Sequence, residues 1–363
     1  MVSRPCFKAA ILGAVVFNVS NIAIAQEWKW INDELYAQLR NIHRLIEGDI
    51  QRDKQVRRAA LESSEEMWQY INANSNEPDI DQAWFRLFYM DMRAGNQKVF
   101  SEHLQICLKK FSKDSNIFRS ARRLLARQAL FKARGLTELQ AEIQRFEKDF
   151  PRALIDNMDL RMVAAEHALA AGDTSTAGKL YGEADTLLKT ASEEWSGNDQ
   201  LRSSLQAARK TNQDRLELFR KSFDDFGGDD LNGNPIQFRD FHGSVALVSF
   251  WCSCLDCKSG HLADCRTLYK AFRAKGLTIL GISLEPTADD AKRAVKELKL
   301  NWRHLWNDKD SANPYMTAFK VKEAPYSVLF DASGRIRYIG LSGLELKEKV
   351  EKLLAELSRP EGK

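Results

Sequence analysis

The 363-residue chain lacks a strong excess of either charge. It contains 54 Lys and Arg against 50 Asp and Glu, so its formal net charge is only +4. A protein that binds nucleic acid usually concentrates positive charge on one face or stripe. The composition therefore gives no reason to expect nucleic acid among the partners. The length is too great for one compact core, which predicts at least two domains.

Long apolar runs are also missing, except at the N-terminus. Residues 1–8 carry Arg4 and Lys8, residues 9–25 are mostly apolar, and a small-x-small pattern ends at Ala25 before Gln26. This order predicts a signal peptide that is cleaved between Ala25 and Gln26, and hence a periplasmic or secreted protein. The alternative is an uncleaved membrane anchor. Polar residues between 18 and 21 interrupt the run, which makes it short for a spanning helix.

Cysteine is scarce, and its distribution is uneven. Of the six cysteines, Cys6 lies in the predicted signal peptide and Cys107 lies far from the rest. Thiols outside the cytosol tend to oxidise unless something keeps them reduced. Four cysteines within fourteen residues do not make a disulfide framework that is spread over a domain, so they indicate a site: Cys252, Cys254, Cys257 and Cys265.

Residues 26–221 lack convincing strand patterns, and their apolar residues recur at helical spacing. Three glycine-containing turns, the first at Gly95, are 40 and then 37 residues apart. This spacing is typical of helical repeat arrays, which often dock a protein partner, and 164–173 resembles part of a tetratricopeptide repeat. An irregular helical bundle is the alternative. His103 and Cys107 lie on an apolar stripe, so we expect them in the core.

Residues 222–363 alternate predicted strands with predicted helices. Such an order predicts a mixed sheet with helices on both faces. The predicted fold class is therefore an N-terminal all-helical hairpin array followed by a C-terminal α/β domain. The predicted strands are 245–250, 277–284, 326–330 and 336–339, and the predicted helices are 257–274, 288–298 and 346–357.

Three cysteines with the spacing C-x-C-x-x-C follow the strand at 245–250. A strand that delivers a C-x-x-C pair to the start of a helix is suited to thiol–disulfide chemistry. Cys252 stands two residues before Cys254, where a disulfide would be strained. Cys252 is therefore either a third redox thiol or a reduced bystander.

The same residues allow a metal site as an alternative. Cys254, Cys257, His261 and Cys252 offer soft ligands, and a helix would place His261 and Cys265 on one face with Cys257. Zinc motifs normally show a second pair of ligands, which the chain lacks here. A copper-handling or other metal-binding module therefore remains open, and the leading hypothesis needs no metal and no other cofactor.

Five features follow one another in a fixed order between residues 223 and 357. In this order they resemble the TlpA/ResA-type thiol–disulfide oxidoreductases, which are exported thioredoxin-fold proteins of the AhpC/TSA-redoxin superfamily. The features are the turn at 231–236 that leads into 238–243, Phe250-Trp251 at the end of a strand, the Cys254–Cys257 pair, the strand at 277–284, and Ala324-Pro325 before a strand that ends in Asp331-Ala-Ser-Gly-Arg335.

The resemblance implies a role for each matching residue. Cys254 would be the attacking thiol, Cys257 would resolve the mixed disulfide, and Pro325 would be a cis-proline beside them. The backbone of Ala324 would pair with an extended substrate, and Trp251 would belong to the substrate-binding surface. The unpaired N–H groups at a helix N-terminus would favour the thiolate of Cys254. The implied partners are exported proteins with thiols or disulfides, and an electron donor.

The chain departs from the TlpA/ResA pattern around the cysteines. The loop before Cys254 is one residue shorter, and Gly260 and Leu262 replace a frequent Glu and Pro. Asp256 places a negative charge beside the thiols, which opposes thiolate formation. Cys252, Asp256 and His261 are therefore possible accessory residues, and the direction of electron flow stays open.

Two further functions remain as alternatives. A peroxidase of the peroxiredoxin type would need Pro-x-x-x-Thr-x-x-Cys, whereas residues 249–254 contain neither Pro nor Thr. The other alternative is a non-catalytic docking protein whose redox domain is a remnant, and the substitutions at Gly260 and Leu262 add weight to it without displacing the leading hypothesis.

Overall fold

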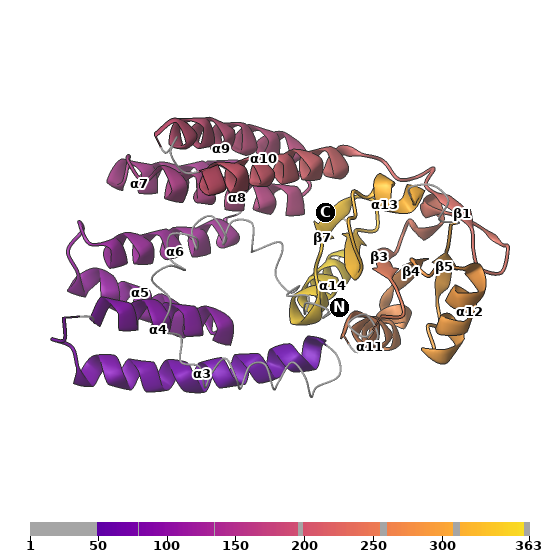
Figure 1. Cartoon of the computed structure of the whole chain (residues 1–363), viewed down its shortest axis with the longest axis horizontal. Coiled ribbons are helices and arrows are strands. Elements are labelled where there is room, and N and C mark those ends of the chain that lie inside the picture. The colour runs from indigo at the N-terminus through magenta and orange to yellow at the C-terminus, as the bar shows by residue number, and fades with distance from the viewer. Residues whose placement is uncertain are drawn as a thin grey trace.

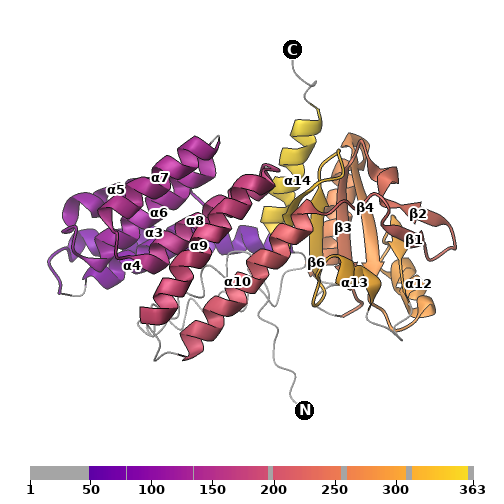
Figure 2. The same cartoon turned by 90° about the horizontal axis from the view of Figure 1, so that it is seen from above.

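A computed structural model shows a curved stack of helices joined to an α/β domain (Figures 1 and 2). It describes residues 49–358, apart from 79, 134, 195–198, 255–259 and 308–312. The predicted signal peptide lies outside the described residues, and so do Asp256 and Cys257. Among the described residues, no helix combines the length and the apolarity that crossing a bilayer requires.

The N-terminal part contains helices joined by short turns. The predicted turn at Gly95 separates α4 from α5, and Gly95 has a positive φ of 72°, which favours glycine. Asn96 then caps α5 by accepting the N–H of Val99. The helices are α3 (Asp49–Ala73), α4 (Ile80–Ala94), α5 (Gln97–Lys110), α6 (Asn116–Lys132), α7 (Leu136–Asp149), α8 (Leu154–Ala170), α9 (Thr174–Glu194) and α10 (Asp199–Arg220).

These helices pack around two separate apolar clusters. One cluster joins α3 to α6 around Trp84, and the other joins α6 to α10 around Phe146. Two clusters in a row are the result of stacking helix pairs, which agrees with an array better than with a bundle around one core. His103 and Cys107 are core residues, as predicted. His103 Nδ1 lies 2.8 Å from Asp91 Oδ2, and burial raises the pKa of Cys107 to about 12.

The C-terminal part contains a five-stranded sheet in the order β5-β4-β3-β6-β7. Strands β3, β4 and β5 are parallel, whereas β6 and β7 run antiparallel to their neighbours. The elements are β1 (Gly227–Asp229), β2 (Pro235–Gln237), β3 (Val245–Trp251), α11 (Leu262–Phe272), β4 (Leu277–Ser283), α12 (Ala288–Glu297), β5 (Arg303–Leu305), α13 (Pro314–Ala318), β6 (Tyr326–Phe330), β7 (Ile336–Ile339) and α14 (Gly343–Leu357).

The predicted mixed sheet is confirmed, with the predicted strands at 326–330 and 336–339 as expected. The short elements β1, β2, β5 and α13 were not predicted, because three to five residues are too few to show a period. A helix was expected from 257; residues 257–259 lie outside the described residues, and α11 begins at Leu262. A wider π-helical turn at Gly260 and His261 precedes it, and such turns are frequent at functional sites.

Strand β3 lies at the centre of the domain, and all of its residues are buried. Ala246, Val248 and Phe250 face a cluster rich in aromatic rings on one side of the sheet. Val245 and Leu247 face the opposite cluster, which α11 and α14 cover. Since successive side chains of a strand point to opposite faces, an apolar run without alternation is what burial on both faces requires.

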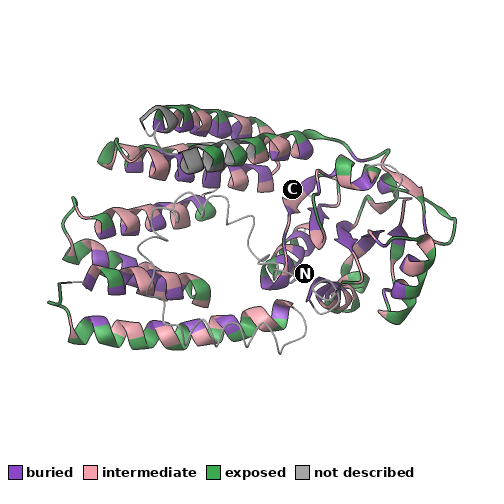
Figure 3. Ribbon diagram, in the orientation of Figure 1, coloured by how far each residue is buried: buried purple, intermediate pink, exposed green. Residues whose placement is uncertain are grey.

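The helical array contacts the α/β domain at both of its ends. At the first end, Ile50 of α3 packs into the core between α11 and α14. At the other end, Lys320 Nζ lies 3.1 Å from Asp214 Oδ1 of α10, and Arg337 Nε of β7 donates to the carbonyl of Ala170. Figure 3 shows buried residues where the array meets the domain. These contacts hold both ends of the array against one domain.

Candidate active site

Cys252 and Cys254 follow β3 directly, at the edge where the parallel strands end. The Cys254 side chain is exposed, whereas Cys252 is half-buried, and their sulfur atoms are 2.7 Å apart. In open α/β sheets, ligands bind at the carboxyl ends of the strands. The structure therefore presents the predicted attacking thiol at the edge where a substrate can reach it.

The loop that leads to Pro325 lies beside the first of these cysteines. The Ala324–Pro325 peptide bond is cis, as the resemblance implies. Ala324 and Cys252 pack against the same apolar cluster, which contains Trp251, Leu262, Ala294 and Leu300. Both Ala324 and Pro325 are half-buried. The fold thus brings together residues that are more than seventy positions apart in the sequence.

Glu285 holds the loop between the two cysteines. Its carboxylate accepts a short hydrogen bond from the backbone N–H of Ser253, and the residue is only 6% exposed. The N–H of Leu284 donates to the carbonyl of Trp251 at 2.8 Å, which ties the ends of β3 and β4 together. Sequence reasoning missed Glu285. The available signal was its place two residues after a strand that is parallel to β3.

Trp251 forms the floor of the site and has no exposed surface. Its indole Nε1 donates to His304 Nδ1 at 3.2 Å. Burial lowers the pKa of His304 to about 4, so the ring is neutral at pH 7 and its Nε2–H is directed to the carbonyl of Leu300 at 3.4 Å. A side chain without exposed surface does not meet a protein substrate, so Trp251 supports the site from below rather than binding substrate as expected.

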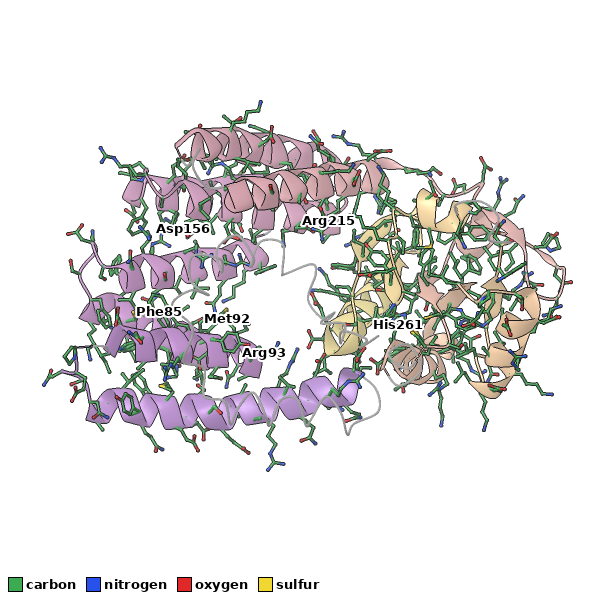
Figure 4. The ribbon with its side chains drawn as sticks, viewed as in Figure 1. Phe85, Met92, Arg93, Asp156, Arg215 and His261 are labelled. Carbon is green, nitrogen blue, oxygen red and sulfur yellow. The ribbon has the colours of Figure 1, made fainter. Side chains whose placement is uncertain are left out.

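His261 belongs to the core beneath β3 rather than to the exposed thiols. Its Nε2 lies 2.9 Å from Ser249 Oγ and 3.6 Å from Cys265 Sγ (Figure 4 labels His261). Burial lowers the pKa of His261 to about 4 and raises that of Cys265 to about 12. The group is therefore a neutral imidazole beside a protonated thiol.

The metal hypothesis combined His261 with Cys254, Cys257 and Cys252. The structure directs His261 to Ser249 and Cys265, and Cys257 lies outside the described residues, so the metal site stays a hypothesis. Within the described ranges, no three His, Cys, Asp or Glu side chains are grouped as metal ligands. Asp256 and Cys257, which were also expected at the site, lie outside those ranges, so their roles remain predictions.

The first turn of α3 lies against the start of α11. The N–H of Ile50 is 3.2 Å from each carboxylate oxygen of Asp264. A Cβ atom on Gly260 would lie 2.7 Å from Arg52 Nη2 and 2.9 Å from Asp49 Oδ1. A side chain at position 260 would therefore require the ends of the Arg52 and Asp49 side chains to shift, so the helical array borders the position of this departure.

The carboxyl group of Asp264 makes the stability of the protein depend on pH. Burial, and then the nearby negative charge of Asp49, raise the pKa of Asp264 to about 7. Since the ordinary value is 3.8, the folded protein binds more protons than the unfolded chain between these two pH values. The contribution of Asp264 to stability is thus complete below about pH 4 and is lost as the pH rises through about 7.

Replacing Asp264 by asparagine should flatten this dependence. Relative to the native protein, Asp264→Asn should gain stability between pH 4 and pH 8, by ~4 kcal/mol at most. The amide oxygen of asparagine can still accept the N–H of Ile50. Urea unfolding of both proteins at the two pH values measures the difference.

Asp173→Asn is a control without a slope in this pH range. Hydrogen bonds from Thr176 lower the pKa of Asp173 below its ordinary value of 3.8, so the contribution of its carboxylate to stability is complete above about pH 4 and is lost only in more acidic solution. The difference in stability between Asp173→Asn and the native protein should therefore be nearly the same at pH 4 and at pH 8. An Asp264→Asn protein that differs from the native protein equally at both pH values would contradict the assignment.

Comparisons with known proteins match the C-terminal part of the chain. Residues 220–339 match the model of the AhpC/TSA family. A thiol-disulfide oxidoreductase ResA from Bacillus thuringiensis subsp. konkukian is 24% identical over 149 residues, which are 41% of this chain and 83% of that protein. A ResA protein from Bacillus cereus is also 24% identical, over 40% of this chain and 82% of its own length.

A solved structure is similar over the same share of the chain. The thioredoxin domain of a thiol-disulfide oxidoreductase from Bacteroides vulgatus is 31% identical, with a TM-score of 0.34, and the match covers 37% of this chain and 96% of that one. The sheet order and the cis-proline described above agree with the sequence matches. The C-terminal part of this chain is therefore a TlpA/ResA-like thioredoxin-fold domain, of which residues 220–339 match the AhpC/TSA family model.

Proposed function

We propose that this protein is an exported thiol–disulfide oxidoreductase that exchanges disulfides with other exported proteins through Cys254 and Cys257. The observation that carries the proposal is the exposed thiol of Cys254, which follows the central strand at the edge of the sheet. Half-buried Cys252 connects this thiol to the cluster that also contacts Ala324, before the cis-proline. The ResA relatives support the reaction type.

The proposed reaction proceeds in two exchanges. The thiolate of Cys254 attacks a sulfur of the substrate disulfide, which forms a mixed disulfide and releases one substrate thiolate. The thiolate of Cys257 then attacks Cys254 Sγ, so that the second substrate thiol leaves and Cys254 and Cys257 are joined. An electron donor, itself a dithiol, returns the pair to the reduced state by the same exchange in reverse.

The substrate site and the location are parts of the same proposal. The half-buried Ala324, at the edge next to the cysteines, supports pairing of its backbone with an extended substrate segment. The basic and apolar residues before Gln26 support export. The curved array, held at both ends against the redox domain, supports docking of a partner protein near the site.

Reduction of insulin disulfides by dithiothreitol tests the reaction type. The purified protein should accelerate the precipitation of insulin chains by at least about tenfold over dithiothreitol alone, because the exposed Cys254 thiol should exchange faster than a free small thiol. Titration of thiols should show two additional thiols per chain after reduction. A protein without either property would contradict the proposal.

A further inference from the structure

Among the described residues, two thiols of the site lie close together in a C-x-C pair. The sulfur atoms of Cys252 and Cys254 are 2.7 Å apart. Two carbon atoms in ordinary contact are ~3.5–4.0 Å apart, and a disulfide measures ~2.05 Å. The two sulfurs therefore approach more closely than non-bonded contact requires, and only a small movement separates them from bonding distance.

The backbone permits this approach. Consecutive Cα atoms are ~3.8 Å apart, so two residues separated by one neighbour lie within ~7.6 Å even in a fully extended chain. The chain bends at Ser253 and Cys254, which shortens that distance toward the ~4.4–6.8 Å that disulfides require. A bridge across the C-x-C pair is therefore within reach without a rearrangement of the sheet.

Two contacts hold the pair in place. The carboxylate of Glu285 accepts the N–H of Ser253, the residue between the two cysteines. Cys252 is half-buried against the cluster of Trp251 and Leu262, whereas Cys254 is exposed. The thiol of Cys254 is thus available to a substrate, and the half-buried thiol of Cys252 is held next to it.

We propose that Cys252 is a second resolving thiol, which forms a redox couple with Cys254 alongside the pairing of Cys254 with Cys257. This inference rests on the proposed oxidoreductase function. After the substrate is joined to Cys254, the thiolate of Cys252 attacks Cys254 Sγ. The Cys252–Cys254 bond forms, the bond to the substrate breaks, and the substrate leaves as a thiolate that takes a proton from water. The substrate gains two electrons, which the two cysteines lose.

A single variant isolates this couple. In Cys257→Ser, the residues between Arg239 and Lys258 form one tryptic peptide, 240–258, that contains Cys252 and Cys254. The variant is treated with oxidised glutathione, blocked with iodoacetamide under denaturing conditions, and digested. We expect most of peptide 240–258 to be two hydrogen atoms lighter than the reduced peptide and without alkyl groups. Full alkylation or glutathionylation of both cysteines would overturn the proposal.

Two double variants serve as controls. Cys252→Ser with Cys257→Ser should not form the bridge, and a mixed disulfide with glutathione should remain on Cys254. Cys107→Ala with Cys257→Ser removes a buried cysteine from another part of the chain and should still form the bridge. Loss of the bridge in that second protein would overturn the proposal, because Cys252 and Cys254 would then not be sufficient to form it.

The activity of these variants separates the inference from the proposed function. With insulin, Cys257→Ser should be at least about tenfold faster than Cys252→Ser with Cys257→Ser, because only the former can resolve its mixed disulfide. Equal rates would overturn a resolving role for Cys252. If the native protein does not reduce insulin although the bridge forms in Cys257→Ser, the oxidoreductase proposal fails and the pairing of Cys252 with Cys254 stands.

Discussion

Replacing Cys254 by serine is expected to lower the rate of insulin reduction by at least about 1000-fold. The reason is chemical: the thiolate is the nucleophile in disulfide exchange, and a hydroxyl group does not replace it at neutral pH. Cys254 is the exposed member of the described pair, whereas Cys252 is half-buried, so Cys252 should not take over the attack on a protein substrate. The rate of insulin precipitation under dithiothreitol measures the effect.

Cys107→Ala is the matched control for this substitution. Cys107 is fully buried in the cluster of α3 to α6, and the pKa of its thiol is raised to about 12, so it does not supply a thiolate. Its removal should leave the insulin rate within about twofold of the native value, because the nucleophile is untouched. If Cys254→Ser retains a tenth or more of the native rate, another cysteine is the attacking thiol.

Replacing Gly281 by valine is expected to lower the free energy of unfolding by ~2–4 kcal/mol. Gly281 of β4 pairs with His304 of β5. Because glycine has no side chain, the rings of Trp251 and His304 can form their hydrogen bond next to it. A Cβ atom there would lie 2.1 Å from His304 Nδ1 and 2.9 Å from Trp251 Nε1. Since both rings are buried, neither can move aside without losing contacts.

Urea denaturation of Gly281→Val measures this loss, and Gly182→Ala is the control. Gly182 lies within α9, and a Cβ atom at that position would have no atom within 4 Å. Alanine there should raise the free energy of unfolding by ~0.5–1 kcal/mol, because glycine loses more conformational freedom in a helix. If Gly281→Val unfolds at the same urea concentration as the native protein, the contact between Trp251 and His304 does not depend on glycine at position 281.

The contacts between the two parts of the chain place the helical array around the redox domain. Ile50 and Asp53 of α3 contact the domain near the starts of α11 and α14, where the N–H of Leu344 donates to Asp53 at 2.9 Å. At the other end of the array, α10 contacts Lys320, five residues before Pro325. Arg215, which Figure 4 labels in the part of α10 nearest the domain, is buried, and it forms an ion pair with Glu166 of α8. The array is therefore anchored near both segments that form the site.

Local patterns in the sequence were sufficient to predict most of the architecture. The apolar run at 245–250 predicted β3, because a strand that is buried on both faces needs apolar residues at nearly every position. Glycine at position 95 predicted the turn there, because glycine tolerates a positive φ. The order of the five motifs from the turn at 231–236 to Arg335 was enough to predict the thioredoxin-type domain. Strands, helices and turns depend on residues that are near neighbours in the chain. Apolar residues at a period of two indicate the buried face of a strand, and a period of 3.6 indicates the buried face of a helix.

Partners that are distant in the sequence were decided only by the tertiary structure. Glu285 reaches Ser253 because β3 and β4 end at one edge, and Asp264 has a raised pKa because α3 lies against it. Trp251 was expected at the substrate-binding surface and His261 as an accessory residue beside the thiols, yet both are buried in the core, since strand and helix orientation decide which side of the sheet a side chain enters. The sequence by itself therefore determined the fold class and the cluster of cysteines. The packing between elements determined which thiols approach each other and which groups are buried, because burial and distance depend on the whole chain.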